Sequence, residues 1–358
     1  MKKKVIALTM AAAMAVTMTA CGSGSQGEAP AAQGGAAAGG SAEETVKIRM
    51  ASTVSSTELE SRATGMSAGL MAWIDTVESE SGGSIQIDLF ADGQLASGTD
   101  AIVNGIQTGA FEASHFNTGS WATYTDAFAE LNVPYLYSDL DDVHKVLDGE
   151  IGAAMKAKLE QDVSGIKALS YIDIGFREVT SSKEIHSVSD MKGLKIRTMD
   201  DKLQIACMEN MGAAVTSVPI TELYSALQTG MVDAQENPLS TIDSQKFYEV
   251  NPYCCLTNHS YTSTFVFMNA DVYNKLSDNQ KAAIEKANEA CMTASKKAAE
   301  AAEDIYRNTL TEKGMTIYAP TEDEMKEFKE VASACWPQAK ELMGEDRYNA
   351  LMAALGIN

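Results

Sequence analysis

The stretch PITELYSALQTGMVDAQENPL (residues 219–239) combines a helix signal with a strand signal on either side of one glycine. Leu223 and Leu227 recur at helical spacing, and Glu222 lies in the first turn, where a negative charge suits the helix dipole. Gly230 then supplies the left-handed residue that commonly closes a helix, and an apolar strand follows. The stretch therefore predicts one helix–glycine–strand connection of an α/β fold.

An earlier stretch of the sequence is similar to this helix–glycine–strand unit. GIQTGAFEA (residues 105–113) matches ALQTGMVDA (residues 226–234) in residue type at most positions, with Gly109 aligned to Gly230. Each stretch predicts a helix whose last turn closes on a left-handed glycine before an apolar strand. The similarity fits two α/β domains of related design, although a common helix–glycine–strand connection also produces such a match by chance.

The rest of the chain alternates helix and strand signals in the same way. VKIRMAS (46–52) and SIQIDLFA (84–91) alternate apolar and polar residues as strands do, and residues 64–83 between them show helical spacing. Such alternation predicts α/β units with largely parallel strands. Residues 277–310 contain no glycine or proline and begin at Ser277, an N-cap candidate, which predicts one helix roughly 45 Å long that runs along both domains.

Length and charge limit the possible functions. The part from Val46 to Asn358 is long enough for two domains. Lys and Arg total 28 against 49 Asp and Glu, a formal net charge of −21, which argues against nucleic acid as a partner. The six cysteines leave an odd number after residue 21, and an odd number cannot all pair within one exported chain, so we expect mostly buried thiols.

The N-terminus predicts export. MKKKVIALTMAAAMAVTMTAC (residues 1–21) has three lysines, an apolar run and small residues before Cys21, which is the order of a signal peptide. A cysteine at this point resembles a bacterial lipobox and predicts lipidation of Cys21; an ordinary signal peptide with a chance cysteine is the alternative. Residues 22–45 contain no large apolar side chain and predict a flexible linker. The protein would then be extracytoplasmic and anchored by lipid to a membrane, facing a periplasm or the outside of a single-membrane cell.

Two arginines lie at the ends of apolar segments. Arg177 follows ALSYIDIGF and Arg197 lies in GLKIRT, and ligands of parallel α/β sheets collect at the carboxyl ends of strands. Two guanidiniums there can grip a carboxylate, because the planar fork matches two oxygens and keeps its charge. The alternative is that each arginine pairs with a neighbouring acid, such as Glu178 or Asp200. Asn237, held extended by the proline after it, would project its amide from another strand end.

Several motifs together resemble a known family. DMKGLKIR, ELYSALQTGMVDAQENPL, KFYEV and LTNHSY occur in the order and spacing of the extracytoplasmic solute receptors of TRAP transporters, the DctP family. The resemblance covers residues 46–358. In proteins of that family, the arginine that matches Arg197 forms a bidentate salt bridge with the ligand carboxylate. The resemblance implies a second ligand contact from Arg177 and an orienting role for Asn237.

The resemblance also implies an architecture and a function. We expect a two-lobed α/β periplasmic-binding-protein fold, type II-like, which closes around its ligand and shares the long helix between its lobes. Lobe I would comprise residues 46–174 and 263–302, and lobe II residues 175–262 and 303–358. The expected function is to bind a small organic acid, such as a sugar acid, in the cleft between the lobes and to deliver it to the small and large membrane subunits of a TRAP transporter. We expect a monomer, with no cofactor and no metal.

The remainder of the pocket departs from the sialic-acid receptors of that family. Ile220 stands where relatives often have an aromatic residue, Asn117 lies near the place of a glutamate, and Ser52 lies near the place of a polar amide. These differences argue against sialic acid and leave uronates, aldonates, C4-dicarboxylates and 2-oxo acids open. The further ligand-binding candidates are Ser52, Thr53, Asn117, Trp121, Met199 and Ile220.

Three other classes of protein remain as alternatives. A secreted enzyme is disfavoured because the four histidines show no metal-ligand spacing and neither a GxSxG elbow nor a Walker loop occurs. A substrate-binding lipoprotein of an ABC importer has the same two-lobed architecture but lacks these motifs. A purely structural lipoprotein leaves the set of Arg177, Arg197 and Asn237 unexplained. We therefore expect a receptor and not an enzyme.

Overall fold

The computed structural model describes residues 43–357 of the chain. The predicted signal peptide, the predicted lipidation at Cys21 and nearly all of the predicted linker lie outside these residues. Contacts with the folded part begin at the first described residues, because Gln280 donates from Nε2 to the carbonyl oxygen of Glu44 at 3.1 Å and Ser84 donates to Glu43 at 3.2 Å. The last residues of the predicted linker are therefore packed against the folded part.

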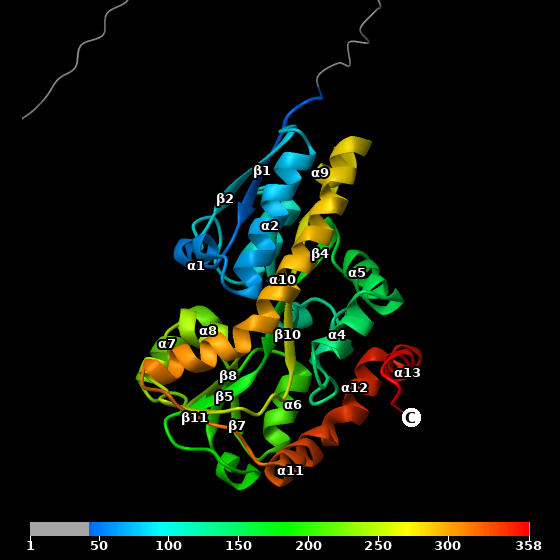
Figure 1. The fold of residues 1–358 in the computed structure, drawn as a ribbon. Coiled ribbons are helices and arrows are strands. Elements are labelled where there is room, and N and C mark those ends of the chain that lie inside the picture. The colour runs from blue at the N-terminus through cyan, green and yellow to red at the C-terminus, as the bar shows by residue number, and fades with distance from the viewer. Residues whose placement is uncertain (1–42, 358) are drawn as a thin grey trace, which may run out of the picture. The chain divides into compact units, whose positions relative to one another are not determined.

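Five strands form the first sheet (Figure 1). They are β1 (Val46–Ala51), β2 (Ile85–Phe90), β3 (Ala113–Asn117), β4 (Ile166–Phe176) and β10 (Tyr261–Asn269). Their order in the sheet is β2-β1-β3-β10-β4. Strand β1 runs parallel to β2 and β3, whereas β10 runs antiparallel to both β3 and β4.

Six shorter strands form the second sheet. They are β5 (Glu178–Ser181), β6 (Lys195–Thr198), β7 (Ala214–Ser217), β8 (Ala234–Asn237), β9 (Tyr253–Cys255) and β11 (Thr316–Tyr318). Their order is β11-β9-β5-β8-β6-β7. Strand β6 runs parallel to β7 and β8, and β11 runs parallel to β9, whereas β5 runs antiparallel to β8 and β9.

The chain passes directly from a strand of one sheet to a strand of the other at two points, and these points account for the antiparallel strands; a third connection, from β10 to β11, runs through α10 (Asp278–Glu312). Strand β4 leads through Arg177 directly into β5, and β9 returns through residues 256–260 into β10. A returning strand enters a sheet in the direction opposite to the strands already there. The prediction of an α/β fold is therefore confirmed, and parallel pairing holds around β1 and β6. The expectation of largely parallel strands is wrong for β5 and β10.

Helices cover both sheets. The α-helices are α1 (Ser56–Ser61), α2 (Gly65–Glu80), α3 (Thr99–Thr108), α4 (Leu140–Leu147), α5 (Glu150–Asp162), α6 (Lys202–Asn210), α7 (Ile220–Gln228), α8 (Leu239–Ser244), α9 (Ala270–Lys275), α10 (Asp278–Glu312), α11 (Glu322–Ala332), α12 (Trp336–Met343) and α13 (Glu345–Ala354). The 3₁₀-helices are η1 (Thr118–Thr123), η2 (Ala129–Asn132), η3 (Val188–Met191), η4 (Phe247–Glu249) and η5 (Ser333–Cys335). Across residues 43–357, no helix combines the length and the apolar character that crossing a membrane requires.

The long helix predicted from Ser277 onward is α10. The Ser277 side chain accepts from the backbone N–H of Gln280, and the Gln280 side chain accepts from the N–H of Ser277, which completes a capping box. The helix packs along α2 and β4 of the first sheet and continues to α8 and β11 beside the second (Figure 1). It therefore contacts elements of both sheets. The residue boundaries of the two lobes stay a prediction.

The C-terminal helices return to the side of the first sheet. Helix α12 contacts η2, and α13 contacts α4. Arg347 on α13 fixes this arrangement, because its Nη1 lies 2.7 Å from Asp126 Oδ2 and its Nε and Nη2 each lie 2.7 Å from a carboxylate oxygen of Glu130. A bidentate pair of this kind holds both partners in one geometry. The last helices are thus attached near the segment that includes η2.

The cysteines after residue 21 are all buried free thiols, namely Cys207, Cys254, Cys255, Cys291 and Cys335. Burial raises the pKa of Cys255 and of Cys291 to about 12, so both stay protonated at neutral pH. The expectation of buried thiols is confirmed.

Helix α2 approaches its neighbours very closely at two glycines. A Cβ on Gly65 would lie 2.0 Å from the carbonyl oxygen of Asp173, which is in β4. A Cβ on Gly69 would lie 2.9 Å from Cβ of Ser295 on α10. The absence of side chains at these positions lets α2, β4 and α10 pack together.

Replacing Gly65 with Ala should therefore destabilise the fold. The obstructing atom belongs to the backbone of β4 and cannot rotate away, so we expect a loss of roughly 3 kcal/mol in the free energy of unfolding, measured by urea denaturation. Ser79→Ala, at an exposed position of the same helix, should change the stability by less than about 0.5 kcal/mol. A Gly65→Ala protein as stable as the wild type would contradict this packing.

Candidate functional site

A pocket of about 600 Å³ lies between elements of the two sheets. The first-sheet side contributes Thr53 after β1, residues 97–102 at the start of α3, and residues around the junction of β3 and η1. The second-sheet side contributes Arg197 and the residues after β6, residues 217–221 before and at the start of α7, and Asn237. The volume is typical of sites for small organic ligands.

Arg197 places a positive charge in the wall of this pocket. It lies in β6 and is only 3% exposed, and its Nε donates to the carbonyl oxygen of Val218 at 2.7 Å. Its Nη1 is buried and has no hydrogen-bond partner among the described residues. Burial lowers the pKa of Arg197 to about 10, against an opposing effect of the Glu236 charge, so the side chain is still protonated at neutral pH. A buried cation with an unsatisfied donor is costly, which indicates a site for an anion.

Asn237 lies at the end of β8, next to β6 in the same sheet. It is 4% exposed and lines the pocket. Its Oδ1 accepts from Arg177 Nη2 at 3.0 Å, and its Nδ2 donates to Gln235 Oε1 at 2.5 Å. These two bonds fix the amide orientation, and the second Nδ2 hydrogen has no partner from residues 43–357.

Arg177 lies behind Asn237 and is not among the residues that line the pocket. It is 1% exposed and forms an ion pair with Glu236. Its Nη1 donates to Thr262 Oγ1 at 2.8 Å, and its Nη2 donates to the carbonyl oxygen of Glu236 at 2.6 Å. Arg177 therefore touches the pocket through Asn237, and its own contact with a ligand stays a prediction. Its acidic partner is Glu236, and not the neighbouring acid considered from the sequence.

Glu236 is the site residue that the sequence reasoning missed. It is fully buried, and His259 Nε2 lies 3.2 Å from its Oε2. Burial opposes its charge, but the charge of Arg177 and the hydrogen bond from His259 outweigh burial and lower the pKa of Glu236 to about 2. An acidic residue inside a short buried strand was the available signal, because such a residue needs a buried cation.

The other candidates divide into two groups. Thr53, Asn117, Met199 and Ile220 line the pocket together with Arg197 and Asn237. Ser52 and Trp121 do not. Ser52 is buried and lies 2.8 Å from His115 Nε2, and Trp121 is fully buried and stacks on Phe116 with 4.2 Å between ring centroids.

The start of α3 is a part of the pocket that the sequence reasoning did not single out. Residues Ser97 to Ile102 line it, and the N-cap residue Gly98 has no side chain with which to cap the helix. A helix that begins without a capping side chain was the signal in the sequence. Within residues 43–357, no group of three or more His, Cys, Asp or Glu side chains is placed to hold a metal ion.

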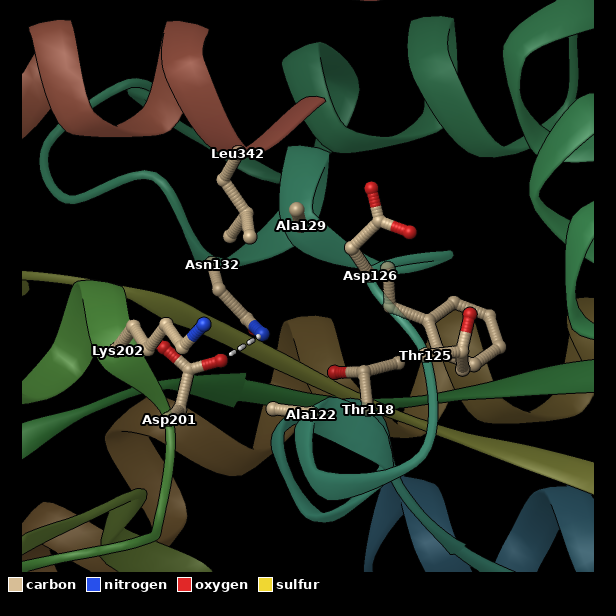
Figure 2. Close-up of a pocket in the computed structure, with 10 residues that line it drawn as sticks. Thr118, Ala122, Thr125, Asp126, Ala129, Asn132, Asp201, Lys202 and Leu342 are labelled. Carbon is tan, nitrogen blue, oxygen red and sulfur yellow. Dashed lines mark hydrogen bonds between the residues drawn. The ribbon is translucent and has the colours of Figure 1, made fainter. Parts of the chain in front are cut away.

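A second, small cavity of about 30 Å³ lies between η1, η2 and the start of α6 (Figure 2). Asn132 and Asp201 point toward one another there, and Asn132 Nδ2 donates to Asp201 Oδ2 at 2.9 Å. Asp201 also caps α6, accepting from the N–H groups of Leu203 and Gln204. The cavity has room for about one water molecule. It therefore joins η2 to α6 through polar contacts and is too small for an organic acid.

A pocket between two α/β sheets, with a buried and unsatisfied guanidinium in its wall, defines a ligand-binding protein of the two-lobed type. Comparison with known sequences places the chain within a family. Residues 56–342 match the family model of DctP, bacterial extracellular solute-binding protein, family 7. The chain belongs to this family, and the resemblance drawn from its motifs is confirmed.

Individual relatives agree with this assignment. The chain is 34% identical over 218 residues to the 2,3-diketo-L-gulonate-binding periplasmic protein YiaO of Escherichia coli, a match that covers 60% of this chain and 66% of YiaO, just under two thirds. A TRAP periplasmic solute-binding protein from Sulfurospirillum deleyianum with bound succinate superposes with a TM-score of 0.79 and 26% identity, over 87% of this chain and 99% of that one.

A further solved structure is similar to the same degree. The sugar acid binding protein DctPAm from Advenella mimigardefordensis, in complex with galactonate, gives a TM-score of 0.80 and 26% identity over 87% of this chain and 98% of that one. The two-lobed binding-protein fold is therefore confirmed. The family and the fold are those of solute-binding proteins, which favours this class over the enzyme and the structural lipoprotein.

The ion pair behind the pocket can be tested through Glu236. Because a buried cation without its partner is strongly destabilising, Glu236→Gln should lower the free energy of unfolding at pH 7 by about 3–5 kcal/mol. The pKa of about 2 in the folded protein lies below the ordinary 4.5, so the stabilisation by this carboxylate is full above the ordinary value and is lost as the pH falls toward 2.

Urea denaturation at pH 7 and at pH 3 checks both points, and the difference between wild type and variant should shrink at pH 3. Glu345→Gln is the matched control, because Glu345 is exposed and pairs only with Lys340 on the surface. Equal stability of Glu236→Gln and wild type at pH 7 would show that Glu236 does not neutralise Arg177.

Proposed function

We propose that this protein is the extracytoplasmic solute receptor of a TRAP transporter and that it binds a small organic acid in the pocket between its two sheets. The ligand carboxylate forms a salt bridge with Arg197. One observation carries this proposal: Arg197 Nη1 is buried in the wall of the pocket and has no partner in the part of the chain that the structure describes. A carboxylate supplies the two oxygens and the negative charge that this guanidinium lacks.

The neighbouring groups support the same assignment. Among the described residues, one Nδ2 hydrogen of Asn237 beside Arg197 has no partner, and the buried ion pair of Arg177 and Glu236 holds its amide in place. A preorganised donor costs little entropy when the ligand binds. The bound ligands of the similar structures, succinate and galactonate, each carry a carboxylate.

The ligand would act by stabilising a closed arrangement of the two sheets. Three segments join the sheets along the backbone, namely Arg177, residues 256–260 and helix α10 between β10 and β11. A closed pocket excludes water, and the lower effective dielectric strengthens the contact between Arg197 and the carboxylate. The ligand can favour the closed state only by its higher affinity for that state. The closed receptor would then dock on the small and large membrane subunits.

The N-terminal segment completes the proposal. A signal peptide over residues 1–21, lipid on Cys21 and a linker over residues 22–45 would anchor the receptor to the membrane from outside the cytoplasm. The linker would let the receptor reach the membrane subunits while it stays attached.

The anchor residue can be tested directly with Arg197→Ala. We expect binding of the best acid among D-galactonate, D-glucuronate, succinate and pyruvate to weaken about 100-fold or more, because its buried carboxylate loses its partner. Isothermal titration calorimetry of the purified protein measures this affinity.

The matched control is Lys195→Ala, which removes an exposed cation from the same strand and should leave the affinity unchanged. A loss of less than tenfold in Arg197→Ala would overturn Arg197 as the carboxylate anchor.

Lipidation can be tested separately. A Cys21→Ser protein expressed in a bacterial host should be released from the membrane fraction and should no longer incorporate an alkyne-labelled fatty acid, because the thiol that would carry the lipid is gone. Fractionation and fluorescent detection of the label compare it with the wild type. A wild-type protein without label would remove the lipid anchor from the proposal and leave the binding site untouched.

A further inference from the structure

The charges that line the pocket are uneven. Arg197 is the only Lys, Arg or His among the lining residues that the structure describes. Asp100 at the start of α3 and Asp200 after β6 add one carboxylate from each side. Asp100 Oδ1 accepts a hydrogen bond from the hydroxyl of Tyr124 at 2.5 Å, which holds it in place. The pocket therefore offers a place for one ligand carboxylate and opposes a second.

Neutral hydrogen-bonding groups fill much of the remaining wall. The N-cap residue of helix α3, Gly98, has no side chain to cap the helix, and the first N–H groups of a helix have no partner within it. Hydroxyl side chains line the pocket on both sides, from Thr53, Ser97, Thr99, Ser120, Thr123, Ser217 and Thr221. These donors and acceptors match the hydroxyl groups of a polyol.

The positive end of the α3 dipole does not provide a second site for a ligand carboxylate. Asp100 lies in the first turn of the helix and already places a carboxylate at that end. An acidic residue in the first turn complements the helix dipole and leaves less of it for an anion of the ligand. A second carboxylate on the ligand would therefore meet Asp100 and Asp200 with no cation between them.

The size of the pocket agrees with a large ligand. A volume of about 600 Å³ lies within the range of about 300–1,000 Å³ that drug-sized ligands occupy. A pocket of this volume has room for an acid of six or more carbons, whereas a four-carbon diacid would leave much of the volume to water.

We infer that the ligand is a polyhydroxylated acid with a single carboxylate, an aldonate or uronate of six or more carbons, and that Asp100 selects it against dicarboxylates. This inference rests on the proposed function. The carboxylate binds Arg197, and hydroxyl groups at the other end of the ligand donate to Asp100 and accept from the start of α3. Overall similarity does not decide between the two ligand classes, because the succinate-bound and galactonate-bound structures are equally identical to this chain, at 26%. The charges that line the pocket favour the sugar acids over the dicarboxylates.

Calorimetric titration with D-galactonate, D-gluconate, D-glucuronate, succinate and malate tests the inference. The sugar acid that binds most tightly should bind at least about 100-fold more tightly than either dicarboxylate, because like charges brought together cost several kcal/mol. In Asp100→Asn, the affinity for that sugar acid should fall about tenfold through the lost charged acceptor, while succinate should bind no more weakly than before. Asp88→Asn changes an exposed aspartate on β2, outside the pocket, and should alter neither affinity.

The outcomes separate the two proposals. If a dicarboxylate binds as tightly as the sugar acids and Arg197→Ala still abolishes its binding, the substrate class is wrong and the proposed function stands. If Asp100→Asn leaves the ratio of the affinities for sugar acid and succinate unchanged, Asp100 is not the selecting residue. If none of the acids binds, or if binding survives Arg197→Ala, the proposed function fails and the substrate class falls with it.

Discussion

A guanidinium that is removed from water needs a negative charge beside it, and the two buried arginines of this protein meet that need in different ways. Arg177 is neutralised within the protein by Glu236, whose pKa is lowered to about 2 by that contact despite its burial. Among residues 43–357, Arg197 has the carbonyl oxygen of Val218 as its one hydrogen-bond partner, and its buried Nη1 has none. Arg177 therefore stabilises the fold through its ion pair, whereas Arg197 is a buried cation that a ligand anion would neutralise.

The fold places these two arginines close together although the chain separates them. Strand β4 ends at the crossing between the sheets, where Arg177 lies, and β6 carries Arg197 next to β8 in the second sheet. Asn237 ends β8 and accepts from Arg177, so it connects the structural ion pair to the pocket. The close packing of α2, β4 and α10 at Gly65 and Gly69 holds the first sheet, which supplies the opposite wall.

Local patterns in the sequence predicted the helices and strands, but they did not predict which distant residues pair with one another. The helix–glycine–strand unit around Gly230 and the N-cap at Ser277 follow from neighbouring residues, whereas the family resemblance, and not local pattern, implied that Arg197 and Asn237 face the ligand. Glu236 is 59 residues from Arg177 along the chain, and their pairing depends on the antiparallel register of β5 and β8, which no local signal encodes. Trp121 looked available for a ligand because burial is a property of the packed structure. It lies in an aromatic cluster with Phe116 and Phe267.

A crystal structure of the protein with the sugar acid that binds most tightly tests the central claim most directly. The account predicts both carboxylate oxygens of the ligand at about 2.7–2.9 Å from the guanidinium nitrogens of Arg197, with Arg177 still paired to Glu236. A ligand whose carboxylate lies against another part of the pocket, with Arg197 Nη1 still lacking a partner, would contradict it.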